Sequence, residues 1–131
     1  MPYKINEKQF MAINSLSDHD RYKHFISKVA DWHEIWSVRT SEGWLVPATP
    51  EGIEYLPLWP HLDYAQRIAD EIWPGHVAEE FDYEFLVNEG FNQLGEDGVK
   101  IAVFPNMDWQ CVLVDARQLL DDLKTEGLKY S

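Results

Sequence analysis

The side chains best suited to chemistry in this chain gather in the stretch WPHLDY, from Trp59 to Tyr64. An imidazole, a carboxyl group and a phenol follow a tryptophan there, at the predicted start of a helix. Free N–H groups at a helix N-terminus favour an anion, and an imidazole can serve as acid or base beside a tyrosine donor. Trp59, His61 and Tyr64 are therefore candidate residues of a small-molecule or peptide pocket. The structural alternative is that Trp59 packs in the core, Pro60 starts the helix and His61 or Asp63 satisfies its first turn.

The other reactive residue types form no recognised catalytic or metal-binding pattern. His76 and Glu80 have a four-residue spacing, but zinc needs three or four converging ligands, and the sequence contains no HExxH motif or paired CxxC motif. Cys111 lies in the apolar run CVLV, which favours a structural thiol over a nucleophile. Asp20 and His24 fit an exposed ion pair at i, i+4 helical spacing. We therefore predict no catalytic residue, no metal and no cofactor, and an enzyme is not favoured.

Tryptophan is the second notable feature, with six in the chain. Tryptophan is enriched at the centres of protein interfaces. Trp44, Trp59 and Trp109 are therefore candidate binding residues, together with His61 and Tyr64. The alternative is that the tryptophans are large, partly buried core residues.

Composition excludes several classes of partner. The chain has 131 residues, and 23 acidic against 11 basic side chains give a formal charge of −12. This negative field repels nucleic acids and anionic membranes and attracts a basic protein or a cation. The alternative, which we favour, is that the acidic balance simply keeps a soluble protein in solution. A single cysteine fits a reducing compartment, the polar N-terminal residues do not resemble a signal peptide, and no apolar run reaches the ~18 residues that span a bilayer. We expect an acidic, cytoplasmic protein with one domain over residues 1–131.

Hydrophobic spacing predicts about five helices with a sheet between them. Caps at Asn6, Ser17, Asp82 and Asp115 mark helix starts. The helices are expected near residues 6–15, 18–31, 62–72, 83–94 and 116–127. Strands are expected at 35–39, 44–48, 53–58, 77–81, 99–104 and 110–114, and prolines in the second and third of them favour edge positions.

The stretch from Val99 to Val114 organises the predicted sheet. Its two apolar runs flank a short loop, as in a hairpin, and both runs are apolar on both faces. Such strands must be covered on both sides, so we place the pair inside the sheet. The fold class predicted is α/β (α+β), a single compact domain with a mixed, largely antiparallel sheet and about five helices packed on it.

Three short motifs carry a resemblance to a known family: Leu58-Trp59-Pro60-His61, then Tyr64-Ala65, and later Val103-Phe104-Pro105. Together with a closing leucine-rich helix, they resemble an uncharacterised family of small bacterial proteins classed as a domain of unknown function. The similarity runs from about Phe10 to Leu123. It implies a compact α/β domain in a bacterial cytoplasm and no established activity.

Three functional hypotheses follow, in order of preference. The first is a non-enzymatic interaction or regulatory module that binds a protein, favourably a basic one, through the aromatic residues Trp44, Trp59 and Trp109. The second is a small-molecule-binding protein or small enzyme that uses the junction from Trp59 to Tyr64. The third is a homodimer formed by pairing of edge strands.

Overall fold

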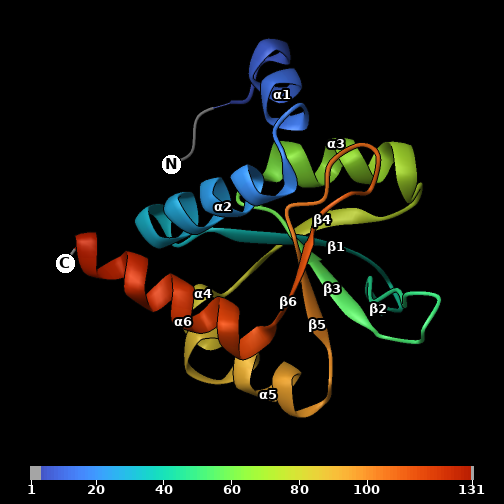
Figure 1. Cartoon of the computed structure of the whole chain (residues 1–131). Coiled ribbons are helices and arrows are strands. Elements are labelled where there is room, and N and C mark those ends of the chain that lie inside the picture. The colour runs from blue at the N-terminus through green and yellow to red at the C-terminus, as the bar shows by residue number, and fades with distance from the viewer. Residues whose placement is uncertain (1–3, 131) are drawn as a thin grey trace.

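The computed structural model describes residues 4–130, beginning with the helical pair α1 (Glu7–Asn14) and α2 (Asp18–Trp32) (Figure 1). Asn6 and Gln9 form the predicted capping box, in which each side chain accepts a hydrogen bond from the other residue's backbone N–H. The hydroxyl of Ser17 accepts from the backbone N–H of Asp20 at 3.1 Å. Both predicted helix starts are confirmed, because these caps depend only on neighbouring residues.

The first sheet has the order β2-β1-β4 and is antiparallel throughout, with β1 (Ile35–Thr40), β2 (Gly43–Trp44) and β4 (Val77–Phe81). The predicted strand at residues 44–48 is shorter than expected. It ends at Trp44, and Ala48 forms only an isolated bridge with Glu54. Pro47 has no N–H to donate to a ladder, which accounts for the early end.

The second sheet has the order β3-β5-β6, built from β3 (Tyr55–Leu58), β5 (Lys100–Val103) and β6 (Val112–Asp115). β5 runs parallel to β3 and antiparallel to β6. The prediction for the hairpin from Val99 to Val114 is right for β5, which is central and buried. It is wrong for β6, an edge strand whose Leu113 is 40% exposed. Apolar residues on both faces do not distinguish a covered strand from a partly exposed edge.

One isolated bridge connects the two sheets. The backbone N–H of Trp36 donates to the carbonyl of Trp59, and the reverse bond has the same length, 2.8 Å. The bridge lies beside the part of β1 that the short strand β2 leaves unpaired. The chain therefore leaves the second sheet at Trp59, in contact with the first sheet, and enters α3 (Leu62–Ile72) immediately afterwards.

The remaining helices follow the predicted order. Two details differ: the helix predicted at residues 83–94 contains a π-helical turn, and the predicted cap at Asp115 does not form. These helices and turns are α4 (Tyr83–Phe85), the π-helical turn Leu86–Gly90, α5 (Phe91–Glu96), α6 (Ala116–Gly127) and a closing 3₁₀ turn (Leu128–Tyr130). A Cβ at Gly90 would lie 2.8 Å from Cδ2 of Leu86, so glycine permits this close approach within the π turn. Asp115 makes no capping bond, because its carboxylate pairs with Lys100 on the neighbouring strand.

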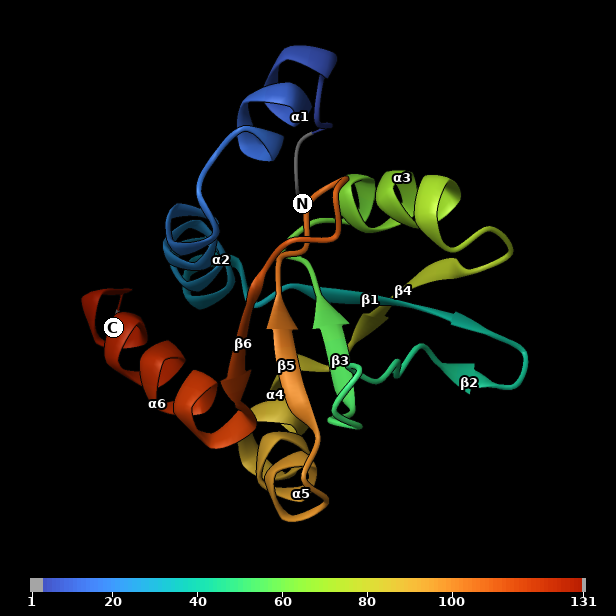
Figure 2. The ribbon, with the colours of Figure 1, turned by 45° about the vertical axis from the view of Figure 1, so that its right-hand side comes forward.

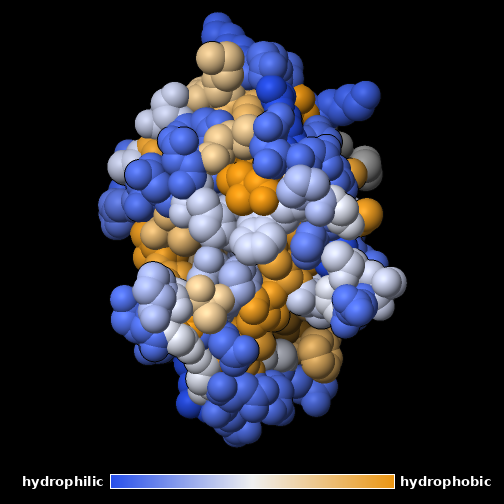
Figure 3. All heavy atoms as spheres, turned by 90° about the vertical axis from the view of Figure 1, so that its right-hand side faces the viewer, coloured by the Kyte–Doolittle hydropathy of each residue, from blue (hydrophilic) through white to orange (hydrophobic). Residues whose placement is uncertain are grey.

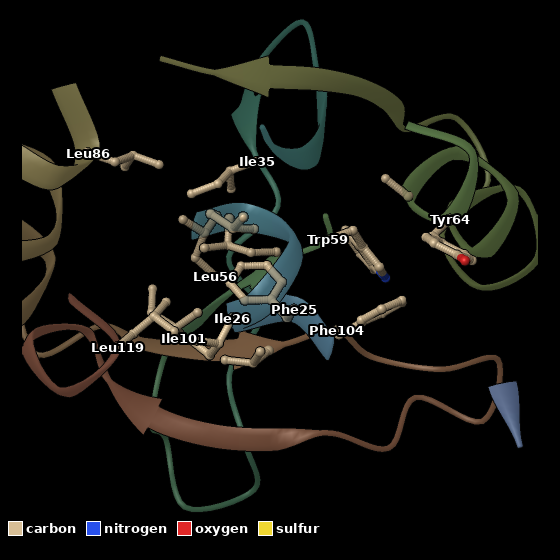
Figure 4. Packing of buried hydrophobic residues seen from close by; sticks show 14 of the residues in the cluster. Phe25, Ile26, Ile35, Leu56, Trp59, Tyr64, Leu86, Ile101, Phe104 and Leu119 are labelled. Atoms are coloured by element: carbon tan, nitrogen blue, oxygen red, sulfur yellow. The ribbon is translucent and has the colours of Figure 1, made fainter. Parts of the chain in front are cut away.

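Helices pack against the two sheets, with α2 and α6 side by side and α3 on β4 and β1, whereas the β2 side is formed by strand and loop (Figures 1 and 2). Trp59, Tyr64 and Phe104 lie together at one end of the shared core (Figure 4). The result is a single compact α+β domain with mostly antiparallel strand pairing, as predicted, but its strands form two sheets where one was expected. Across residues 4–130, none of the helices is both long and apolar enough to cross a membrane.

Candidate functional site

A hollow opens where α2 faces the junction between β3 and α3. Its enclosed space is about 20 Å³, little more than one water molecule needs. We call it the junction hollow, and it is lined by His24, Lys28, Trp32, Glu34, Pro60, His61 and Tyr64. Two of the predicted site residues, His61 and Tyr64, therefore lie at a recess rather than on a convex surface.

Three of the lining residues come from one face of α2. His24, Lys28 and Trp32 recur every four residues, which places them in one row along the helix. The Trp32 side chain, at the last residue of α2, is 46% exposed. The helix ends directly afterwards, because His33 adopts the left-handed conformation with φ of 56°.

His24 corrects one expectation from the sequence. Instead of forming an exposed ion pair with Asp20, its ring turns inward and lies 5.9 Å from the ring of Phe104. Burial lowers the pKa of His24, and the positive charge of Lys28 lowers it further. We therefore expect a neutral imidazole at pH 7, held in a locally positive part of an acidic protein.

His61 and Tyr64 form the opposite wall. His61 is the N-cap of α3, and its Nδ1 accepts a hydrogen bond from the backbone N–H of Asp63 at 3.0 Å. This is the capping role of the structural alternative, but His61 also faces the hollow. Tyr64 packs its ring 5.0 Å from that of Phe104 and edge-on to His61 at 6.0 Å. The carboxylate of Asp63 accepts from the backbone N–H of Ile5 at 2.9 Å.

Glu34 completes the wall and was not predicted. Its side chain is nearly buried, and Oε1 accepts a hydrogen bond from the indole of Trp36 at 2.7 Å. Burial raises the pKa of Glu80, and the charge of Glu34 raises it further. Nothing in the sequence groups Glu34 with His24, Lys28 and Trp32. The spacing of those three residues at i, i+4 and i+8 was the only sequence pattern that pointed to a shared wall.

Trp59 and Trp109 belong to an aromatic cluster with Trp73, in which Trp59 is buried and the other two tryptophans are partly exposed. Trp59 has no exposed surface, and its indole N–H donates to the carbonyl of Pro105 at 3.0 Å. Its ring centre lies 6.1 Å from that of Trp109, which in turn lies 5.8 Å from that of Trp73. The indole of Trp109 donates to the hydroxyl of Tyr55 at 2.8 Å. As placed here, Trp59 cannot contact a partner directly.

Trp44 has different neighbours. Its ring stacks on Phe81 with a centre distance of 4.1 Å, and the guanidinium of Arg39 lies 5.1 Å from its centre. Arg39 also lies 3.6 Å from the carboxylate of Glu79. Among the described rings, no contact joins Trp44 to Trp59 or Trp109. The expectation of one exposed patch formed by these three tryptophans is therefore corrected, while the binding role of Trp44 stays a prediction.

The sequence also missed Arg21, which is fully buried. Its guanidinium donates to the carbonyls of Phe104 at 2.9 Å and Gln110 at 2.8 Å, and to Leu16 and Asp18. Phe104 adopts a positive φ of 56°, an unfavourable conformation for a bulky residue. Arg21 therefore holds the backbone of Phe104, the residue whose ring packs against His24 and Tyr64.

The remaining reactive groups do not form a second centre. Burial and the nearby charge of Asp18 raise the pKa of the Cys111 thiol to about 11, so the nucleophilic thiolate is scarce at neutral pH. Within residues 4–130, no group of three or more histidine, cysteine, aspartate or glutamate side chains is arranged to hold a metal.

The architecture defines a small α+β domain in which two three-stranded sheets meet at a tryptophan bridge. Residues 22–123 match the family described as "Protein of unknown function (DUF2750)", and the chain belongs to that family. The matched region extends from α2 into α6 and contains every residue that lines the junction hollow. No curated protein and no solved structure matches the chain.

Proposed function

We propose that this protein is a binding domain whose junction hollow holds a small molecule, without catalysing a reaction on it. The observation that supports the proposal is the convergence of ionisable side chains from α2, β3–α3 and the residue before β1 on one recess. Polar groups that meet in an otherwise apolar concavity are typical of ligand sites. The half-exposed indole of Trp32 provides an apolar surface at the same recess.

Substitution of Trp32 tests the proposed ligand binding, because this partly exposed side chain can be removed without loss of core packing. We expect small molecules found by thermal shift on the wild type to bind Trp32→Ala at least ~10-fold more weakly by calorimetry, since the main apolar contact is lost. Phe85→Ala is the matched control. Phe85 is 52% exposed and does not line the hollow, so this variant should bind as the wild type does. Equal affinity of wild type and Trp32→Ala would contradict the proposal.

A second candidate function is the interaction module for a basic protein partner. The stacked pair Trp44 and Phe81 adjoins a groove of about 500 Å³ lined by His33, Glu80, Phe81, Asp82, Tyr83 and Glu84. Carboxylates beside aromatic rings suit a guanidinium or ammonium group, and the formal charge of −12 would attract such a partner. Figure 3 shows apolar side chains in the middle of the face on the β2 side, bordered by polar ones. A homodimer through edge strands stays a further proposal.

The groove can be tested with a defined arginine-rich peptide. We expect Glu80→Gln with Glu84→Gln to weaken its binding by about 10-fold at low salt, because two attractive charges are lost. Glu51→Gln with Glu71→Gln changes the net charge equally, at exposed positions outside the groove, and should have a smaller effect. Equal effects of the two double variants would show a general attraction to an acidic surface and would contradict a groove-specific role.

A further inference from the structure

We propose that the junction hollow takes the carboxylate group of a small apolar acid, with Lys28 and His24 beside the carboxylate and Trp32 against the apolar part. The inference rests on the proposed ligand-binding function and adds the chemical class of the ligand. Three features of the hollow support this inference: the charges around it, its size, and the exposed indole of Trp32 on one side.

The charges around His24 favour an anion. On its own helix, the charge of Lys28 is near enough to lower the pKa of His24, and His61 and Tyr64 line the same hollow. The N-terminus of α3, an 11-residue helix, adds partial positive charge on that side. Glu34 is the one carboxylate in the lining; its Oε1 accepts the indole N–H of Trp36, and its negative charge offsets part of the positive charge of Lys28.

The size of the hollow favours a ligand that inserts a single oxygen atom. The space open to water-sized groups, about 20 Å³, is little more than one such group needs. One oxygen of a carboxylate can enter this space, and the rest of the molecule would lie outside it, over the opening of the hollow. The apolar part of the acid would then lie on the indole of Trp32, where exposed apolar surface is available.

Proton uptake is a measurable consequence. Burial and the charge of Lys28 keep the pKa of His24 below its ordinary value of 6.5. A carboxylate placed beside the ring favours the imidazolium and raises that pKa. The acid should therefore bind most tightly below the pKa of free His24, and the advantage is lost as pH rises through the higher pKa of the complex. Each unit of increase corresponds to about a tenfold gain in affinity.

The test uses benzoate as the probe, with benzamide, benzylamine and inorganic phosphate for comparison. We expect benzoate to raise the pKa of His24 in an NMR titration and to shift the ¹⁹F signal of 5-fluorotryptophan at position 32. Binding should be several-fold tighter at about pH 5.5 than at about pH 7.5. His24→Gln should remove this pH dependence, whereas His19→Gln, at an exposed position on the same helix, should retain it.

Each contrary result has a distinct meaning. Equal binding of benzamide or benzylamine, or an unchanged His24 pKa with benzoate bound, would overturn the preference for a carboxylate but leave a ligand site. A rise in the His24 pKa with phosphate and no shift at Trp32 would indicate a general anion effect and would also overturn the proposal. If no small molecule of the wider thermal-shift set affects Trp32, the proposed function itself fails.

Discussion

Replacement of Arg21 by methionine is expected to lower the stability of this protein by about 3–5 kcal/mol, the typical cost of breaking a buried charge network. The guanidinium connects α2 to the segment after β5 through the carbonyls of Phe104 and Gln110. Methionine fills much of the volume but donates no hydrogen bond, so these buried oxygens lose their partner. The hold on the positive φ of Phe104 is lost at the same time.

Thermal unfolding measures this effect, and Arg67→Met is the matched control. Arg67 is an exposed arginine that pairs with Glu7, and exposed ion pairs contribute about 1 kcal/mol or less. We expect the melting temperature to fall by roughly 10 °C or more for Arg21→Met and by only a few degrees for Arg67→Met. Arg21→Lys should lie between them, because lysine keeps the charge without the planar set of donors. Similar melting temperatures for the two methionine variants would contradict the structural role of Arg21.

Replacement of Trp59 by alanine should be equally damaging, at about 3–5 kcal/mol. The indole is fully buried at the bridge between the sheets, packs against Trp109 and donates to the carbonyl of Pro105. Trp59→Phe should cost less, about 1–3 kcal/mol, since it keeps most of the apolar contact and leaves one buried carbonyl without its donor.

The free energy of unfolding in urea tests whether Trp59 acts in the core or in binding. Trp32→Ala is the control, because it removes the same type of side chain from an exposed position. Trp32 is about half exposed, and its loss should change the free energy of unfolding by less than about 1 kcal/mol. A Trp59→Ala variant as stable as Trp32→Ala would disprove the core assignment. If the difference is as expected, a loss of partner binding in Trp59→Ala reports unfolding rather than a lost contact.

Much of the fold could be predicted because its signals are local. The cap at Ser17 and the capping box at Asn6 are made by residues three positions apart, so sequence alone contains both partners. The α+β class and the family resemblance also came from patterns within short stretches of sequence. The assignment of a binding site to the junction from Trp59 to Tyr64 stays a prediction. His61 and Tyr64 do line a hollow at that junction.

The failures have a common physical cause. The edge position of β6 and the cap at Asp115 both depend on partners distant in the chain, as when Lys100 pairs with the carboxylate of Asp115. Likewise, Trp59 could be judged buried or exposed only once its neighbours were known, and amphipathic spacing does not tell whether a particular histidine, such as His24, faces water or a cavity.

The sequence by itself therefore determined the helices, their starts, the fold class and the acidic charge of this protein. Only the tertiary structure brought His24, Lys28 and Trp32 of α2 against Glu34, His61 and Tyr64 to form the junction hollow. Caps and hydrophobic periods act between neighbouring residues, whereas a site depends on contacts that form when distant elements pack on one core.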